Sequence, residues 1–82
     1  MVPKITGINA GDDYILTIRF DNGIQKKYDF KRNFKEPVFQ ALRDKYLFQQ
    51  VKVDPGGYGI SWNDDLDLSE YELWENGMVV QA

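Results

Sequence analysis

Hydrophobic and polar side chains alternate between residues 14 and 30, and this alternation predicts two paired strands. The even-numbered side chains are apolar from residue 14 to 20, and again from 24 to 30 with the exception of Lys26. A two-residue period of this kind is typical of strands that bury one face. The sequence Asp21-Asn22-Gly23 lies between the two runs and is a strong hairpin signal.

The register of this hairpin follows from the need to bury one face of it. A two-residue turn would place the apolar side chains of the two strands on opposite faces. A three-residue loop instead pairs Leu16 with Tyr28 on one face. It also pairs Phe20 with Ile24 on that face. We therefore expect a type I turn followed by Gly23 at positive φ.

A strand over residues 5–10 is predicted before the hairpin, and a short helix over about 37–44 after it. Pro37 suits the first helical position, because its missing N–H has no partner there. The spacing of Phe39 and Leu42 predicts that both side chains lie on the sheet.

A second hairpin is predicted from strands at 51–53 and 58–62. The turn between them is Asp54-Pro55-Gly56-Gly57, in which proline presets φ and glycine is free to take positive φ. Pairing Asp54 with Gly57 places Val53 opposite Tyr58, so the apolar side chains of these two strands also share a face.

The last predicted element is a helix over about 70–76. Ser69 and Glu72 have the spacing of a capping box, in which each side chain accepts a bond from the backbone N–H of the other residue. Asn76-Gly77 is the matching stop signal. The segment from Met78 to Ala82 either closes the sheet as a short strand or forms a tail.

These elements predict one α+β domain over residues 1–82, in the order β-β-β-α-β-β-α. Its sheet is expected to be mainly antiparallel, with the short helices packed on one face. The sequence holds no apolar run close to the ~20 residues of a membrane span and no export signal. We therefore expect a cytoplasmic protein that does not contact membranes.

The composition limits the reactions that the side chains of this chain can catalyse. The chain has no cysteine and no histidine, so it has no thiolate nucleophile and no side chain that titrates near neutral pH. It has 10 basic and 13 acidic residues, and every basic residue lies at or before Lys52. Residues 1–52 therefore carry +4 and residues 53–82 carry −7. We expect the two parts to fold against each other and neutralise in part.

The order and spacing of the elements resemble a known family. The residues that carry the resemblance are Leu16–Phe20 with Asp21-Asn22-Gly23, Tyr28-Asp29, Pro37-Val38-Phe39 with Leu42, Phe48 with Val51-Lys52-Val53-Asp54, Gly59-Ile60-Ser61-Trp62, and Asp67-Leu68-Ser69 with Leu73-Trp74. Over residues 5–76 the chain is similar to a small bacterial domain, domain of unknown function 2442. The resemblance implies an α+β fold without established enzymatic activity. It also implies a gene beside that of another small protein, in a pair of the toxin–antitoxin kind.

Two surface patches are candidate binding sites. Aromatic side chains rimmed by carboxylates suit protein interfaces, and the last helix carries Tyr71, Glu72, Trp74 and Glu75. Cations interleaved with aromatic rings suit single-stranded nucleic acid, and the segment 26–35 carries Lys26, Lys27, Lys31, Arg32 and Lys35. The overall acidic composition opposes attraction to phosphate.

Two further motifs are expected to be turns. Asp65, Asp67 and Ser69 have the spacing of the first three calcium ligands of an EF-hand, but Glu70 occupies the position that needs glycine. The glycine-rich segment 54–59 has no lysine or helix directly behind it, as a phosphate loop requires. We therefore expect no metal and no cofactor.

The sequence thus favours a noncatalytic cytoplasmic protein-interaction domain, the antitoxin-like partner of a small toxin-like protein. It would bind this partner through an exposed sheet edge or through the acidic last helix. The alternative is a nucleic-acid-binding regulatory domain that uses the basic segment 26–35. The chain itself is expected to be a monomer or a weak homodimer.

Overall fold

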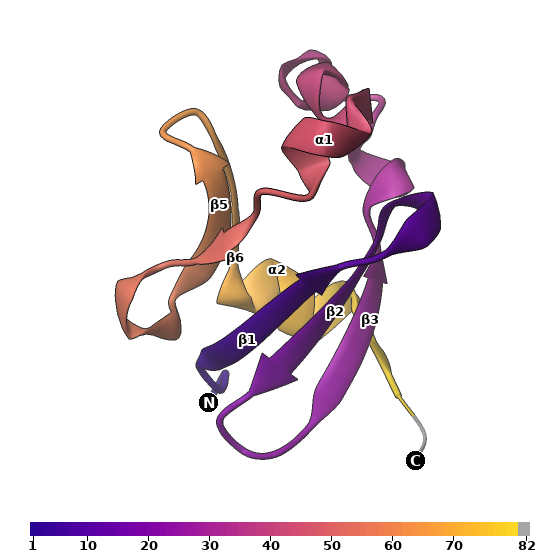
Figure 1. Ribbon diagram of the computed structural model, residues 1–82. Helices are drawn as coiled ribbons and strands as arrows, with labels where there is room; N and C mark the ends of the chain where they lie inside the picture. Colours follow the sequence, from indigo (N-terminus) through magenta and orange to yellow (C-terminus); the bar gives the residue numbers. More distant parts are fainter. Residues whose placement is uncertain (81–82) are drawn as a thin grey trace.

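Two antiparallel sheets and several short helices build the fold of residues 1–80, the part that the computed structural model describes (Figure 1). The larger sheet has four strands in the spatial order β1 (Ile5–Ala10), β2 (Ile15–Phe20), β3 (Gln25–Asp29) and β7 (Met78–Val79). The smaller sheet has three, β4 (Lys52–Val53), β5 (Gly59–Asn63) and β6 (Leu66–Ser69). The α+β class and the antiparallel pairing are confirmed, but the strands form two sheets.

The helices are α1 (Lys45–Phe48) and α2 (Glu70–Asn76), with four 3₁₀ helices between the strands. These are η1 (Asp12–Tyr14), η2 (Phe30–Asn33), η3 (Pro37–Arg43) and η4 (Pro55–Gly57). In Figure 1, α2 lies behind the four-stranded sheet, and the hairpin of β5 and β6 stands to one side of it. No helix within residues 1–80 has the length and hydropathy needed to span a membrane.

The predicted β2–β3 hairpin is confirmed, including its register. Leu16 pairs with Tyr28, and both side chains are fully buried. The Gly23 amide donates to the Phe20 carbonyl at 3.0 Å, and Gly23 has φ +86°. The three-residue loop therefore keeps the apolar side chains of both strands on one face, as burial requires.

The helix predicted over 37–44 is not an α-helix. Residues 37–43 form the 3₁₀ helix η3, and the backbone is extended at Asp44. The Asp44 carboxylate accepts hydrogen bonds from the amides of Tyr46 and Leu47, so it caps a separate helix, α1. Leu42 is fully buried and Phe39 packs on the core, which confirms that both side chains face inward.

The predicted register of the second hairpin is wrong by two residues. Val53 pairs with Ile60 instead of Tyr58. Gly56 and Gly57 both have positive φ, and the Asp54 amide donates to the Gly59 carbonyl. The turn is therefore longer than a two-residue Pro-Gly turn.

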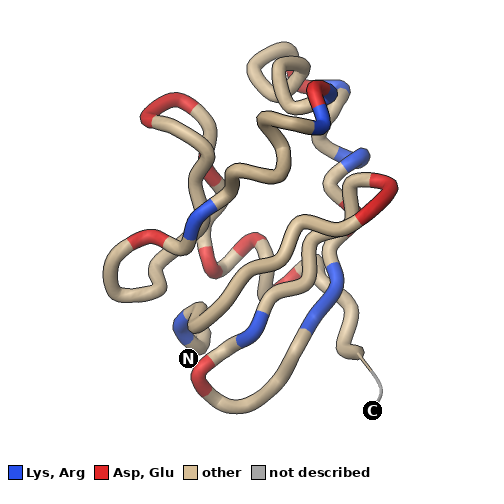
Figure 2. The backbone as a smooth tube through the Cα atoms, viewed as in Figure 1, with Lys and Arg blue, Asp and Glu red and all other residues tan. Residues whose placement is uncertain are grey.

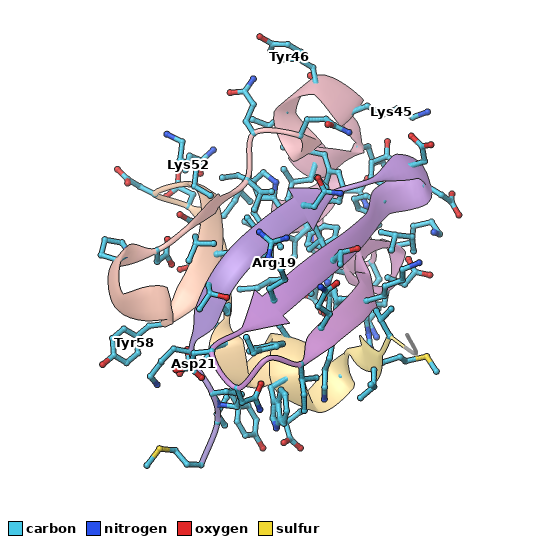
Figure 3. The ribbon with its side chains drawn as sticks, turned by 60° about the horizontal axis from the view of Figure 1, so that its bottom comes forward. Arg19, Asp21, Lys45, Tyr46, Lys52 and Tyr58 are labelled. Carbon is cyan, nitrogen blue, oxygen red and sulfur yellow. The ribbon has the colours of Figure 1, made fainter. Side chains whose placement is uncertain are left out.

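Two tyrosines project from the fold. Tyr58 lies in the longer turn between β4 and β5 and is 61% exposed. Tyr46 of α1 is 78% exposed. Both side chains point away from the body of the protein in Figure 3.

The sequence analysis missed strand β6. Leu66 pairs with Asn63, and Leu68 pairs with Ile60, so the acidic segment around Asp64 is a hairpin turn. The alternation of Leu66 and Leu68 with Asp67 and Ser69 was the signal for it.

Helix α2 begins and ends as predicted. The Ser69 hydroxyl accepts a hydrogen bond from the Glu72 amide at 3.1 Å. Glu72 does not return the bond to Ser69. Its carboxylate accepts from Tyr28 at 2.7 Å instead, so only half of the capping box is present.

Replacing Ser69 by alanine removes this cap and is expected to lower the free energy of unfolding by about 1 kcal/mol. Urea denaturation followed by tryptophan fluorescence measures the change. The matched comparison outside α2 is Ser61→Ala. This change removes a hydroxyl of β5 that donates to the Asp54 carboxylate. An unchanged urea midpoint for Ser69→Ala would show that water replaces the cap without loss.

Aromatic rings join the two sheets into one core. The Phe30 ring follows β3 and lies 5.2 Å from Trp62 of β5 and 5.6 Å from Phe48 of α1, measured between centroids. Phe34 and Phe39 complete the cluster around it. The Trp62 indole donates to the Phe48 carbonyl at 2.9 Å, so the only polar atom of that ring is satisfied.

Candidate interaction surface at the edge of the four-stranded sheet

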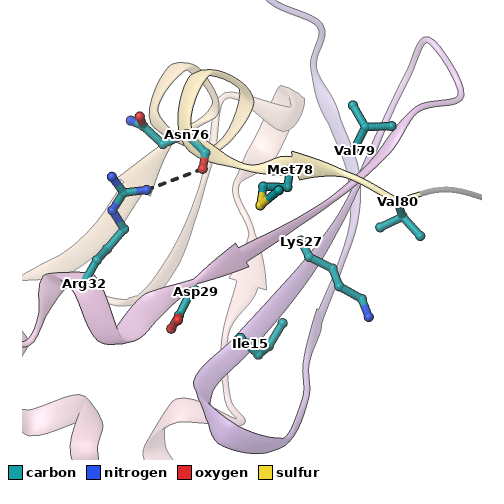
Figure 4. A pocket seen from close by; sticks show the side chains of 8 residues that line it. All are labelled: Ile15, Lys27, Asp29, Arg32, Asn76, Met78, Val79 and Val80. Atoms are coloured by element: carbon teal, nitrogen blue, oxygen red, sulfur yellow. Dashed lines mark hydrogen bonds between the residues drawn. The ribbon is translucent and has the colours of Figure 1, made fainter.

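An open groove of about 580 Å³ lies where β3 meets β7. Figure 4 shows it from close by. Its walls come from β2, β3, η2, the last residue of α2 and the segment 78–80. Its lining residues are Ile15, Lys27, Asp29, Arg32, Asn76, Met78, Val79 and Val80.

Strand β7 leaves apolar side chains in solvent beside this groove. Met78 is 76% exposed and Val79 is 54% exposed. In Figure 4, Met78 and Val80 point to the side of the sheet that carries Lys27, and Val79 points to the other side. This alternation follows from the period of a strand. Both faces of β7 are therefore apolar and open.

One edge of β7 has free backbone groups. The register pairs Lys27 with Met78, and the Val80 amide donates to the Gln25 carbonyl at 3.0 Å. Because hydrogen-bonded pairs alternate in an antiparallel ladder, Met78 and Val80 direct their backbone groups toward β3. Val79 directs its N–H and C=O away from β3, to the side where residues 1–80 supply no further strand.

A second hollow lies along the same strand. It measures about 360 Å³ and is lined by Gly23, Ile24, Gln25, Val79 and Val80. Strand β7 is thus hollowed along its contact with β3 in two places, and only a short ladder holds it there. A segment of this kind has low local stability and adapts readily to a partner.

Cations flank the groove. Lys27 and Arg32 are both exposed. The Asp29 carboxylate also lines the groove, but it accepts from the Lys31 amide and lies 3.1 Å from the Lys31 ammonium group. The charge available to a ligand of the groove is therefore mainly that of Lys27 and Arg32.

The four residues predicted as a patch on α2 are not all exposed. Tyr71 is 60% exposed, and Glu75 is also exposed. Trp74 is half-buried, with its ring 5.0 Å from Phe20. Glu72 faces inward, where it accepts hydrogen bonds from Tyr28 and Asn76. Only two of the four predicted residues are therefore presented to a partner.

The basic residues predicted to contact nucleic acid are also divided. The Lys26 ammonium group lies 3.9 Å from the centre of the Trp74 ring and donates to the Trp74 carbonyl. The Lys31 ammonium group lies 3.1 Å from the carboxylates of both Asp13 and Asp29. These two cations are thus engaged within the fold.

The other three basic residues of that segment are exposed. Lys27 lies in the groove and Lys35 lies in the loop after η2. Arg32 donates weakly to the Asn76 carbonyl at 3.4 Å. Figure 2 shows basic residues spread over several elements, with acidic residues between them. The structure does not bring the five predicted cations together as one patch.

The acidic turn after β5 is held by its own hydrogen bond, from the Asp65 amide to the Asn63 side chain at 2.9 Å. Within residues 1–80, histidine, cysteine and carboxylate side chains form no cluster of three that could hold a metal ion. The glycine-rich segment is the turn η4, and its Gly57 packs against the backbone of Ile5.

A part-buried polar network ties α2 to the sheet. The Tyr28 hydroxyl donates to Glu72 at 2.7 Å and accepts from the Asn33 amide group at 3.0 Å. Burial, and after it the hydrogen bond to the Glu72 carboxylate, raises the pKa of Tyr28 to about 12. These groups position α2, and so place the residues that follow it along β3.

The sequence analysis missed the groove itself. Gly77-Met78-Val79-Val80 is a run without charge directly after an acidic helix, and that was the available signal. The partner of this run lies about fifty residues earlier in the sequence, at Lys26 and Lys27.

The comparisons with known proteins give one match. The family model described as "Protein of unknown function (DUF2442)" matches residues 5–78. No curated protein and no solved structure gives a significant match. The matched residues include all strands of both sheets up to Met78 and the whole of α2. The chain therefore belongs to the DUF2442 family of proteins of unknown function.

Proposed function

We propose that this chain is a noncatalytic, cytoplasmic protein-interaction domain that receives an extended segment of its partner along the free edge of β7, beside the β3–β7 groove. The observation that carries the proposal is the exposure of Met78 and Val79, 76% and 54%, on a strand with a free edge. Exposed edges with unpaired backbone groups bind extended peptides by adding a strand, and apolar side chains beside them supply the affinity.

The groove suits a partner segment that combines apolar side chains with a carboxylate. Ile15, Met78 and Val80 offer an apolar floor, and Lys27 and Arg32 are exposed at its rim. Binding of nucleic acid is less well supported, because Lys26 and Lys31 make contacts within the fold and the chain carries a net charge of −3.

The first partner to test is a small toxin-like protein. This choice rests on the resemblance to a bacterial family whose genes lie in pairs of the toxin–antitoxin kind. An acidic extended segment in that partner would match the cations at the rim of the groove.

Isothermal titration calorimetry with the product of the adjacent gene tests the proposal. Met78→Asp places a carboxylate in the apolar groove, and we expect it to weaken binding at least about tenfold. The matched comparison is Glu75→Lys, which changes the exposed charge of α2 and leaves the groove intact.

A loss of binding in Glu75→Lys with none in Met78→Asp would move the site to α2 and overturn the groove. The absence of binding by the unaltered chain would overturn the proposed partner. Retardation of RNA or DNA that weakens steeply with salt would favour the alternative function.

A further inference from the structure

The free edge of β7 can pair with the same edge of a second copy of this chain across a two-fold axis. Val79 is the residue whose N–H and C=O both point away from β3. In an antiparallel ladder, two residues directly opposite each other exchange both of their hydrogen bonds. Two Val79 residues can therefore pair across a two-fold axis without any change in the β3–β7 register.

This pairing also matches the side chains. When Val79 lies opposite Val79 of the second copy, Met78 lies opposite the second copy's Val80, and Val80 opposite its Met78. Met78 and Val80 point to the same side of β7 (Figure 4). The four side chains would form one apolar cluster over the groove and remove from solvent the surface that a single copy exposes.

The segment that would lie at the axis carries no charge, and the cations of the groove, Lys27 and Arg32, lie on β3 and η2. In a two-fold contact, each charge near the axis meets its own copy and is repelled by it. The segment Gly77-Met78-Val79-Val80 has no charge. In Figure 2 the end of the chain is free of blue and red up to the residues in grey. Strand β7 is short, but it carries neither lysine nor proline, two of the residues that protect edge strands from pairing.

The opposite end of the same sheet is not open in this way. Strand β1 is followed on its outer side by the turn η4, where a Cβ atom on Gly57 would lie 2.4 Å from the Ile5 carbonyl oxygen. This turn therefore covers the start of β1, and β7 is the end at which the sheet can extend.

We propose that two copies of this chain pair antiparallel through β7, centred on Val79, and join their four-stranded sheets into one continuous sheet. The pair uses the groove named under the proposed function but does not depend on a partner of another kind. Because the dimer covers that groove, it competes with partner binding. The contact is smaller than the ~1,200 Å² of stable interfaces, so we expect a weak dimer with Kd on the order of 0.1–1 mM.

Sedimentation equilibrium of the purified chain tests this pairing. We expect the average mass to rise from one chain toward two between about 20 µM and about 1 mM. Val79→Pro removes the outward N–H but keeps the amides of Met78 and Val80 that face β3, since proline is tolerated on a strand whose N–H faces outward. We expect this variant to stay monomeric over the same range. Val79→Thr keeps the N–H and a β-branched side chain, and it should dimerise as the unaltered chain does.

Amide hydrogen exchange of the unaltered chain gives a second readout that needs no folded variant. Protection of the Val79 amide should rise with protein concentration, and that of the Tyr28 amide, which faces β2, should change less. A monomer at about 1 mM, or a Val79→Pro variant that dimerises as before, would overturn the proposal. Because these measurements use the chain alone, their failure leaves binding of another protein in the groove intact.

Discussion

Replacing Phe30 by alanine is expected to lower the free energy of unfolding by about 4 kcal/mol, the largest loss we foresee for a single residue. Phe30 is fully buried and its ring lies at the centre of the aromatic cluster that joins the two sheets. Its removal leaves a cavity between β5 and the four-stranded sheet. A domain of this size has a total stability of about 4–12 kcal/mol, so the variant is expected to lose at least about a third of it.

Urea denaturation followed by tryptophan fluorescence, to which Trp62 contributes with its ring 5.2 Å from Phe30, measures the loss. Phe30→Leu retains much of the volume and is expected to cost about 1–2 kcal/mol, which keeps a folded protein for comparison. Val38→Ala removes methyl groups from a side chain that is exposed, and it should leave the midpoint nearly unchanged. Equal losses in free energy of unfolding for Phe30→Ala and Phe30→Leu would show that the volume filled by the Phe30 side chain does not stabilise the contact between the two sheets.

The sequence predicted the β2–β3 hairpin in full because its signals are local and agree with one another. The turn residues 21–23 set the loop length, and the alternation of side chains selects the one register that buries Leu16 together with Tyr28. A shift by one residue would have exposed a whole face. The cap of α2 at Ser69 was predictable for the same reason, since the bond spans three residues.

The same reasoning gave the wrong register for the second hairpin. The cause is that side chains repeat their direction every two residues along a strand. A shift by two residues keeps the same side chains on the same face, so burial does not distinguish Val53 opposite Tyr58 from Val53 opposite Ile60. The choice depends on the left-handed conformation of both Gly56 and Gly57. Gly57 lies so close to Ile5 that a side chain there would clash, a contact across fifty residues that local patterns do not reveal.

Little of the candidate site could be predicted, because it forms where distant segments meet. Exposed apolar residues at 78 and 79 become a groove only when they pair with Lys26 and Lys27. The charges of Glu72 and Lys26 suggested surface patches, but both side chains make contacts between α2 and β3. The sequence predicted that the basic and acidic parts would neutralise each other in part, but it did not show which side chains pair, because the partners are distant in the sequence.

Replacing Tyr28 by phenylalanine is expected to lower the free energy of unfolding at pH 8 by about 2 kcal/mol. The ring stays buried against the core, and only the hydroxyl is lost. Its hydrogen bond to the Glu72 carboxylate, 2.7 Å long, is charge-assisted and so stronger than a neutral one. The Asn33 amide group loses its acceptor at the same time. Urea denaturation at pH 8 measures the difference from the unaltered chain.

The same variant reports the pH dependence of this network. The pKa of Tyr28 is raised from 10.0 to about 12 in the folded state, so folding favours the neutral phenol. Its contribution is complete below pH 10, falls as the pH rises, and is gone once the phenol ionises in the folded state above about pH 12. We therefore expect the 2 kcal/mol gap between Tyr28→Phe and the unaltered chain to close by about pH 12. Tyr71→Phe, which removes the hydroxyl of an exposed ring, should leave the stability of the chain unchanged across this range. If the difference in free energy of unfolding stays constant from pH 8 to about pH 12, then ionisation of the Tyr28 hydroxyl does not affect stability, and the proposed role of its hydrogen bond to Glu72 is wrong.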